Sequence, residues 1–140
     1  MLDGSPAEVW AVLVDHERWP RWFKGVKSCR ADSDPAVGVG ATRIVTLQGG
    51  TRFNERFIAW EEGSLWAFTA TAIRPGLMNG LVERCTIAEV GNGRTRVTYR
   101  MAFEPATALR PLVPVLRRVL PGRLEAGMKG LAREVQTRRS

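Results

Sequence analysis

Two glutamates, Glu55 and Glu83, are the residues of this chain best placed to carry chemistry. Glu55 stands two residues before Phe57, and Glu83 stands two residues before Cys85 and four before Ile87, in segments otherwise typical of strands. Because side chains alternate between the two faces of a strand, both carboxyls are expected on the apolar face. Burial disfavours a carboxylate and raises its pKa, which would let either group act as a general acid or base.

A second interpretation of these glutamates is purely structural. A glutamate near the end of a strand commonly reaches solvent or pairs with a neighbouring arginine. Arg43 and Tyr99 are the hydrogen-bonding residues expected opposite the two carboxyls. The sequence leaves both interpretations open, so Glu83 and Glu55 are candidates for catalysis and not an assigned pair.

The sequence lacks the residue patterns that usually bind a metal or a cofactor. His16 is the single histidine, and Cys29 and Cys85 are isolated from each other, so no ligand spacing typical of zinc is present. No segment resembles a nucleophile elbow or a phosphate-binding glycine loop. We therefore expect neither a bound metal nor a cofactor, and we expect two free thiols in a cytoplasmic protein.

The composition is that of one globular domain covering residues 1–140. The chain is 44% hydrophobic and 25% charged. It contains no apolar run of the roughly 20 residues that a membrane span needs. The N-terminus also lacks the pattern of a signal peptide. An integral membrane protein is therefore not expected.

The net charge of +7 raises the question of an anionic partner, either nucleic acid or a membrane surface. The arginines are spread through the strands, with a looser group between Arg110 and Arg139, and none alternates with aromatic residues in a stacking pattern. A solvated basic face is the simpler interpretation. We expect no nucleic-acid partner, while peripheral contact with a membrane stays open as an alternative.

The chain begins with a well-marked helix. Ser5 can cap this helix, and Glu8 completes a capping box three residues later. Apolar residues then recur at helical spacing, and a second short helical segment follows that carries Trp19 and Trp22. Core packing is the simpler role for both tryptophans, and Trp19 is the one that could line a cavity.

Six strand-like segments follow, separated by turns rich in glycine, proline, aspartate and asparagine. Because the connections are short, neighbouring strands are predicted to be antiparallel and to form a meander. The last strand alternates most cleanly, with Tyr99, Met101 and Phe103 on one face. The predicted strands are Val26–Ala31, Ala41–Leu47, Arg52–Trp60, Leu65–Ile73, Leu81–Val90 and Arg94–Phe103.

The C-terminal third is predicted to contain a connection and then a helix. Four prolines between Glu104 and Gly122 indicate a broken connection, with at most a short helix around Leu112–Leu120. From Gly122 onward, apolar residues repeat at four, three and four residues and form a narrow stripe. This stripe, made of Leu124, Met128, Leu131 and Val135, is expected to cover the apolar face of the sheet.

Four segments carry a resemblance to a known family. They are SPAEVWAVLVDHERWPRWFKGV (Ser5 to Val26), the pair Gly40-Ala41, ERFIAWEEGSLWAF (Glu55 to Phe68) and GNGRTRVTYRMAFEP (Gly91 to Pro105). In this order they resemble the polyketide cyclase/dehydrase and lipid-transport family of the START-like, SRPBCC or Bet v 1-like helix-grip superfamily. The resemblance implies an α+β fold with two short N-terminal helices, a curved antiparallel sheet and a long C-terminal helix packed across it.

One departure from the family concerns the first strand. The four residues Met1–Gly4 leave no room for the family's usual strand before the opening helix, so about six strands are expected. Without that strand, ladder edges would be exposed, which favours pairing with a second copy of the chain as a homodimer.

The resemblance also implies a cavity between sheet and helix that binds a hydrophobic small molecule. An adaptable apolar pocket would suit the methionines and aromatic residues of the predicted inner face, although a plain core would use the same residues. The candidate ligand-binding residues are Trp19, Val45, Phe57, Phe68, Cys85, Ile87, Tyr99, Met101, Phe103, Met128 and Leu131.

Three functions are compatible with this sequence. The first is binding of a hydrophobic ligand such as a lipid or polyketide. The second is a polyketide cyclase or dehydrase, although the strands carry no histidine and no catalytic constellation of the family can be matched residue by residue. The third is a basic peripheral membrane or interaction module that uses the fold without a ligand.

Overall fold

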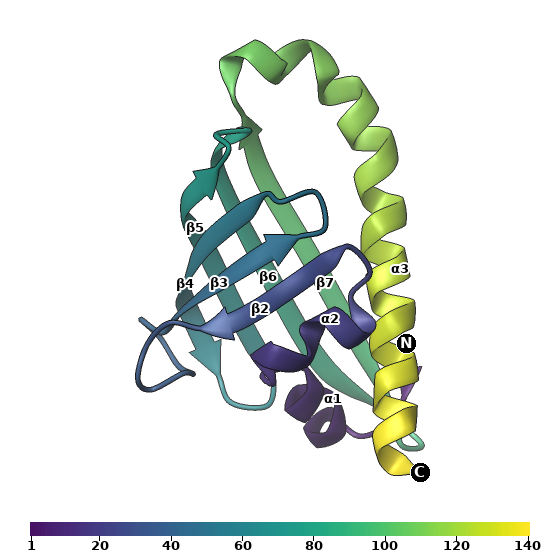
Figure 1. Cartoon of the computed structure of the whole chain (residues 1–140). Coiled ribbons are helices and arrows are strands. Elements are labelled where there is room, and N and C mark those ends of the chain that lie inside the picture. The colour runs from purple at the N-terminus through teal and green to yellow at the C-terminus, as the bar shows by residue number, and fades with distance from the viewer.

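The computed structural model describes residues 1–140, and its seven strands form one antiparallel sheet that curves around a long C-terminal helix (Figure 1). The order across the sheet is β1-β7-β6-β5-β4-β3-β2. The strands are β1 (Leu2–Asp3), β2 (Val26–Ala31), β3 (Thr42–Leu47), β4 (Arg52–Glu61), β5 (Leu65–Arg74), β6 (Met78–Gly91) and β7 (Arg94–Pro105). The helices are α1 (Pro6–Leu13), η1 (His16–Arg18), α2 (Trp19–Trp22), η2 (Thr107–Leu112) and α3 (Val113–Arg139).

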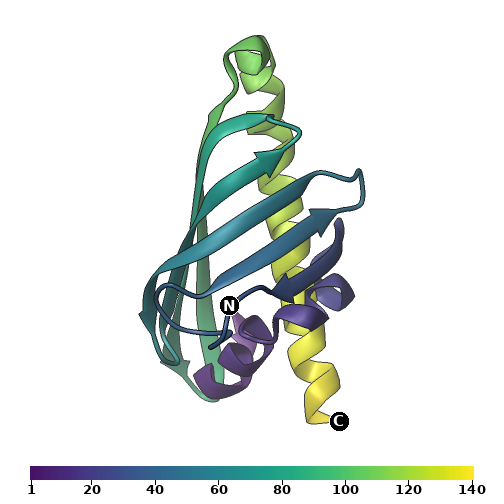
Figure 2. The same ribbon diagram turned by 60° about the vertical axis from the view of Figure 1, so that its left-hand side comes forward.

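The sheet's concave face carries the core. Along β6, Leu81, Glu83, Cys85 and Ile87 are buried while the residues between them are more exposed, which is the two-residue period of a half-buried strand. Figure 2 shows that α3 passes across the open side of this curved sheet, with α1 and α2 at one end between sheet and helix. The predicted curved sheet with two short N-terminal helices and a long C-terminal helix is therefore present.

The N-terminal helix begins at the predicted cap. The Ser5 hydroxyl accepts a hydrogen bond from the Glu8 amide at 3.3 Å, and the Glu8 carboxylate accepts one from the Ser5 amide at 2.7 Å. This reciprocal pair satisfies two amides that the first helical turn leaves unpaired. In the following segment the Trp19 indole donates to the Leu13 carbonyl at 3.0 Å, which fixes α2 against the end of α1.

The expected number of strands was wrong, because residues before the first helix do pair with the sheet. Leu2 lies opposite Thr95 and Asp3 opposite Arg94 on β7. The Gly4 carbonyl also accepts a hydrogen bond from the Thr95 hydroxyl at 2.7 Å. The sheet therefore has seven strands, and its first strand is only two residues long.

The expected break in the C-terminal third was also wrong. A single helix runs from Val113 to Arg139, straight through Pro121. The proline removes one helical hydrogen bond, but the apolar stripe continues across it, because Leu120 and Leu124 are four residues apart and both face the sheet. None of the helices combines the length and apolarity required to cross a membrane.

The contact between α2 and α3 is close. A Cβ atom placed on Gly130 would lie 1.8 Å from the Trp22 carbonyl oxygen, and one on Gly127 would lie 2.9 Å from the Phe23 ring. These two glycines therefore allow the backbones of α2 and α3 to approach where larger residues would hold them apart.

Candidate functional site

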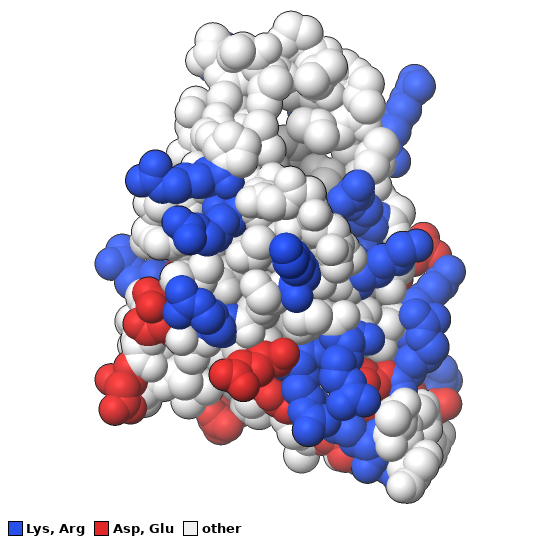
Figure 3. Space-filling view, in the orientation of Figure 1, with Lys and Arg blue, Asp and Glu red and all other residues white.

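A cavity of about 150 Å³ lies between the concave face of the sheet, α2 and α3. Thirteen of its nineteen lining residues are hydrophobic, so its walls suit an apolar molecule. Figure 3 shows a hollow in the upper part of the molecule, surrounded by uncharged residues. An apolar cavity of ~150 Å³ is large enough for benzene, whereas drug-sized ligands commonly occupy about 300 Å³ or more.

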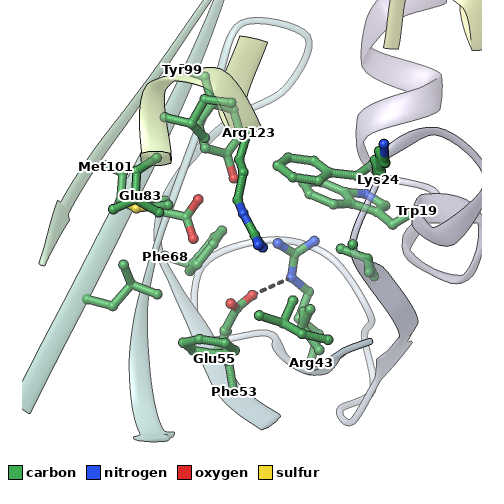
Figure 4. Close-up of a pocket in the computed structure, with 18 of the residues that line it drawn as sticks. Trp19, Lys24, Arg43, Phe53, Glu55, Phe68, Glu83, Tyr99, Met101 and Arg123 are labelled. Atoms are coloured by element: carbon green, nitrogen blue, oxygen red, sulfur yellow. Dashed lines mark hydrogen bonds and ion pairs between the residues drawn. The ribbon is translucent and has the colours of Figure 1, made fainter. Parts of the chain in front are cut away.

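Two charged side chains form a buried ion pair at this cavity. Arg43 on β3 and Glu55 on β4 lie directly opposite each other in the strand register. The Arg43 Nε donates to Glu55 Oε1 at 2.8 Å, and the two side chains are only 1% and 4% exposed (Figure 4). Although burial opposes it, the Glu55 carboxylate raises the pKa of Arg43 above its usual value.

Aromatic rings surround the Arg43 guanidinium. Its central carbon lies 4.4 Å from the centre of the Trp19 ring and 4.8 Å from that of Phe68, with Phe57 and Trp66 slightly farther away. Such contacts are favourable because the ring faces carry partial negative charge. The rings hold the Arg43 guanidinium in place beside Glu55. The N–H groups of Arg43 that do not contact Glu55 can still donate hydrogen bonds.

His16 contacts the other side of the same guanidinium. Its Nδ1 lies 3.3 Å from Arg43 Nη1, and its Nε2 lies 3.1 Å from the Ala36 carbonyl oxygen. Because a guanidinium can only donate, Nδ1 must accept, which assigns the proton to Nε2. Burial, with the Arg43 charge as a second cause, lowers the pKa of His16 to about 4. The ring is therefore neutral at physiological pH.

Glu83 is the second buried carboxyl and has no ion-pair partner. It is 7% exposed and lines the cavity from β6. Burial raises its pKa to about 8, the charge of Glu55 acts in the same direction, and the Tyr99 hydroxyl and Arg43 oppose the shift less strongly. Burial also raises the pKa of Glu55, but Glu55 is the carboxyl that pairs with the buried Arg43 guanidinium. Near pH 7, Glu83 is therefore a neutral acid that can donate a hydrogen bond.

Two cations reach the cavity from its rim. Lys24 follows α2, and Arg123 belongs to α3; both line the cavity, are solvent-exposed and have no ion-pair partner. Figure 4 shows the Arg123 side chain extending from α3 into the space that Glu83 and Arg43 also face. The cavity thus combines apolar walls, a polar floor and a cationic rim.

The structure divides the predicted site residues into two groups. Glu55 and Glu83 line the cavity together with the first group of predicted ligand-binding residues, which is Trp19, Val45, Phe68, Tyr99 and Met101. The second group packs in the core outside the cavity and consists of Phe57, Cys85, Ile87, Phe103, Met128 and Leu131.

Sequence reasoning missed several residues that line the cavity. Phe53 stands two residues before Glu55, and Leu81 stands two residues before Glu83, so the same alternation would have placed both on the inner face. Leu120 was missed because the helix was expected to begin only at Gly122, and Arg123 was missed because it lies in that predicted helix but outside its apolar stripe. No sequence signal marks Lys24, because its place at the rim depends on how α2 meets the sheet.

Comparisons with known proteins give a consistent result. Residues 1–136 match the family described as "Polyketide cyclase / dehydrase and lipid transport". The uncharacterized protein Rv2574 of Mycobacterium tuberculosis is 30% identical over 134 residues, which cover 96% of this chain and 80% of that protein.

Two solved structures share the fold at low sequence identity. TTHA0849 from Thermus thermophilus has a TM-score of 0.83 at 18% identity and covers 99% of this chain and 94% of its own. A START superfamily protein from Mycobacterium smegmatis has a TM-score of 0.82 at 16% identity, covering 97% of this chain and 92% of its own. The predicted helix-grip architecture is thereby confirmed.

Proposed function

We propose that this chain, which belongs to the polyketide cyclase/dehydrase and lipid transport family, binds a small apolar molecule that carries a carbonyl or hydroxyl group. The observation that supports this most is the combination of an apolar cavity with a buried carboxyl, Glu83, that lines its wall without an ion-pair partner and whose pKa burial raises to about 8. A buried polar group without its full set of hydrogen bonds is costly, and a ligand oxygen would accept one from this carboxyl.

The donors at the cavity define the polar end of the ligand. Near pH 7 the Glu83 carboxyl and the Tyr99 hydroxyl are both protonated, and the Arg43 guanidinium is cationic. All three line the cavity and all three can donate. A neutral acceptor such as a ketone oxygen therefore matches this floor better than an amine, which would add a positive charge beside Arg43.

The cavity volume limits the apolar part of the ligand. About 150 Å³ admits one ring or the end of a longer chain. The rest of a longer ligand would extend out of the cavity past Lys24 and Arg123, the exposed cations that line the rim. The proposed ligand class is therefore a monocyclic ketone or phenol, or a longer molecule with such a group at its buried end.

The first experiment compares acetophenone with ethylbenzene, which has a similar shape but lacks the carbonyl. Isothermal titration should give tighter binding of acetophenone, by about fivefold, because one hydrogen bond contributes ~1 kcal/mol. In Glu83→Met this preference should shrink, while ethylbenzene should bind as before. Equal affinities of both compounds for the wild-type protein would contradict the proposed role of the donors.

A second experiment tests the cavity itself. Leu120→Trp fills the cavity from α3, whereas Leu116→Trp, one turn earlier and equally half-buried, does not line it and serves as the matched control. Native mass spectrometry after gentle desalting should detect a co-purifying ligand or added acetophenone on the control but not on Leu120→Trp. Equal loading of both variants would contradict binding in this cavity.

Cyclase or dehydrase activity is the second candidate function, and Glu83 is the specific observation that favours it. A neutral carboxyl beside Tyr99 could protonate a carbonyl oxygen during aldol closure. Acetonylacetone is a suitable small substrate, since forming one C–C bond and losing one water yields methylcyclopentenone. Glu83→Gln should abolish turnover while acetophenone still binds. Turnover that survives this substitution would remove Glu83 as the acid.

A further inference from the structure

Exposed apolar side chains gather where the chain crosses from the sheet to the long helix. Leu77 in the turn before β6 is 38% exposed, Leu112 at the end of η2 is 51% exposed, and Val115 and Val119 on α3 are 56% and 45% exposed. The Ala106 amide donates to the Leu77 carbonyl at 3.0 Å, which holds this turn beside η2. We call these four residues and Arg110, Arg117 and Arg118 the arch surface.

The first turns of α3 are apolar on two faces. Leu116 and Leu120 face inward and are half-buried, and Leu120 lines the cavity. Val115 and Val119, one turn apart, face outward and are exposed. A helix on the surface of a protein in water needs only one apolar face, the one that packs against the rest of the protein. The second, exposed apolar face of α3 therefore indicates that it contacts another apolar surface.

All the charged residues of the arch surface are positive. Between Glu104 and Glu125 the sequence contains four arginines and no acidic residue. None of these arginines forms an ion pair, whereas Arg138 and Arg139 near the end of the same helix pair with Asp15 and Glu8. Figure 3 shows an uncharged surface at the top of the molecule, with basic side chains below it on the left and beside it on the right.

We propose that the arch surface docks on the surface of an anionic lipid membrane. Exposed apolar residues flanked by unpaired arginines, without a single acid, are the pattern of helices that lie in the interface of a bilayer. The apolar side chains would enter the boundary between headgroups and acyl chains, and the arginines would contact the anionic headgroups. A protein partner would need a large complementary acidic surface, whereas a membrane offers both features at once.

Docking in this orientation would bring the cavity close to the bilayer. Val119 faces outward from α3 while Leu120, its neighbour in the chain, lines the cavity. An apolar molecule could then pass between the membrane and the cavity along this part of the helix. This passage rests on the proposed ligand binding, but membrane docking does not.

Co-sedimentation with vesicles tests the docking. The full chain should bind vesicles made of equal parts phosphatidylglycerol and phosphatidylcholine and should bind phosphatidylcholine vesicles weakly. Raising the salt concentration to ~1 M, where the Debye length falls to about 3 Å, should release most of the protein. Binding of equal strength to both vesicle types, or binding that ignores salt, would overturn the proposal.

Two double variants distinguish vesicle binding through the arch surface from binding through the overall positive charge of the protein. Arg117→Gln/Arg118→Gln should weaken binding by about thirtyfold, since each arginine near an anionic surface contributes about 1 kcal/mol. Arg84→Gln/Arg100→Gln removes the same charge from exposed residues opposite each other on β6 and β7 and should bind like the wild type. An equal loss in both pairs would contradict docking through this surface.

The apolar contribution has its own control. Val115→Asp/Val119→Asp should abolish vesicle binding, while Ile58→Asp/Val82→Asp, which changes exposed apolar residues of the sheet, should not. Circular dichroism checks that each variant is folded, and acetophenone binding reports separately on the cavity. If the wild type ignores vesicles and instead forms a dimer that Val115→Asp/Val119→Asp disrupts, the arch surface is a contact between two copies and the membrane proposal is wrong.

Discussion

Arg43 is the residue around which the polar part of the core is organised. Its guanidinium pairs with Glu55, donates to His16 and packs against the rings of Trp19 and Phe68. A buried charge is tolerated only when its partners are close and well aligned. The Arg43 charge lowers the pKa of both titratable neighbours, Glu55 and His16, and in each case acts second to burial.

Removing Arg43 alone should be strongly destabilising. Arg43→Met leaves the buried Glu55 carboxylate without its partner, and we expect the free energy of unfolding to fall by about 3–5 kcal/mol. The double variant Arg43→Met/Glu55→Leu removes both charges and should recover much of this loss. Urea denaturation of the three proteins measures both effects. A double variant as unstable as the single one would show that the aromatic packing, and not the unpaired charge, carries the cost.

Glu83 should make stability depend on pH in a defined direction. Its pKa is about 8 in the folded state and near 4.5 in the unfolded chain, so the folded state holds a proton that the unfolded state has released between these values. The free energy of unfolding should therefore decrease as pH rises from 4.5 to 8 and level off above it, with a slope of at most about 1.4 kcal/mol per pH unit.

The Glu83→Gln variant isolates this effect. His16 acts in the opposite direction, because its lowered pKa of about 4 makes the folded state lose stability as pH falls below 6.5. Subtracting the variant's unfolding free energies from those of the wild type cancels the His16 contribution. A difference curve that is flat between pH 5 and 8 would mean that Glu83 is ionised in the folded protein.

At the scale of secondary-structure elements, α3 is fixed mainly by its C-terminal half. Its buried residues all lie between Gly127 and Val135, and Gly130 allows the closest contact with α2. The sequence predicted this half of the helix, since its apolar stripe has an uninterrupted helical period. It did not predict the first half, because prolines normally end a helix unless the surrounding fold supports it.

Two glycine substitutions on α3 should have opposite effects. Gly130→Ala would push a methyl group into the Trp22 backbone and should lower the free energy of unfolding by about 1–3 kcal/mol. Gly122→Ala meets no atom within 4 Å and should raise stability by up to about 1 kcal/mol through helix propensity. Thermal unfolding by circular dichroism distinguishes them. Equal stabilisation by both would contradict the close α2–α3 contact.

At the scale of the whole molecule, the two ends of α3 are held differently. The C-terminal end is tied to the N-terminal segment by ion pairs from Arg138 to Asp15 at 2.9 Å and from Arg139 to Glu8 at 3.2 Å. The first turns of α3 carry only exposed or half-buried side chains, and the helix meets the cavity only from Leu120 onward. The molecule is therefore most firmly packed at the end opposite the arch surface.

Hydrogen exchange should follow this gradient. Backbone amides of residues 115–120 should exchange faster than those of residues 128–135, because local opening costs least where few apolar groups are buried. Acetophenone should slow exchange in the first segment, where Leu120 contacts the cavity. Mass spectrometry of deuterated peptides measures both. Uniform protection along the helix would show that the first turns are as firmly packed as the rest.

The sequence by itself determined the class of fold, because that depends on local patterns. The Ser5 cap, the two-residue alternation of the strands and the order of the four family motifs are all local, and they predicted the family, the curved sheet and the gripped helix. The same alternation predicted that Glu55 and Glu83 face inward, and both are buried.

Only the tertiary structure decided which inward-facing residues share a cavity and which buried carboxyl has an ion-pair partner. Phe57, Cys85 and Ile87 face inward as the alternation required but pack in the core outside the cavity, and α1 packs against β6, which carries the latter two. Alternation fixes the face of a strand that a side chain occupies, but not which helix covers that point. Similarly, strand register placed Arg43 opposite Glu55, whereas it placed the uncharged residues Phe68 and Met101 opposite Glu83. Register depends on the pairing of distant segments, which no local pattern records.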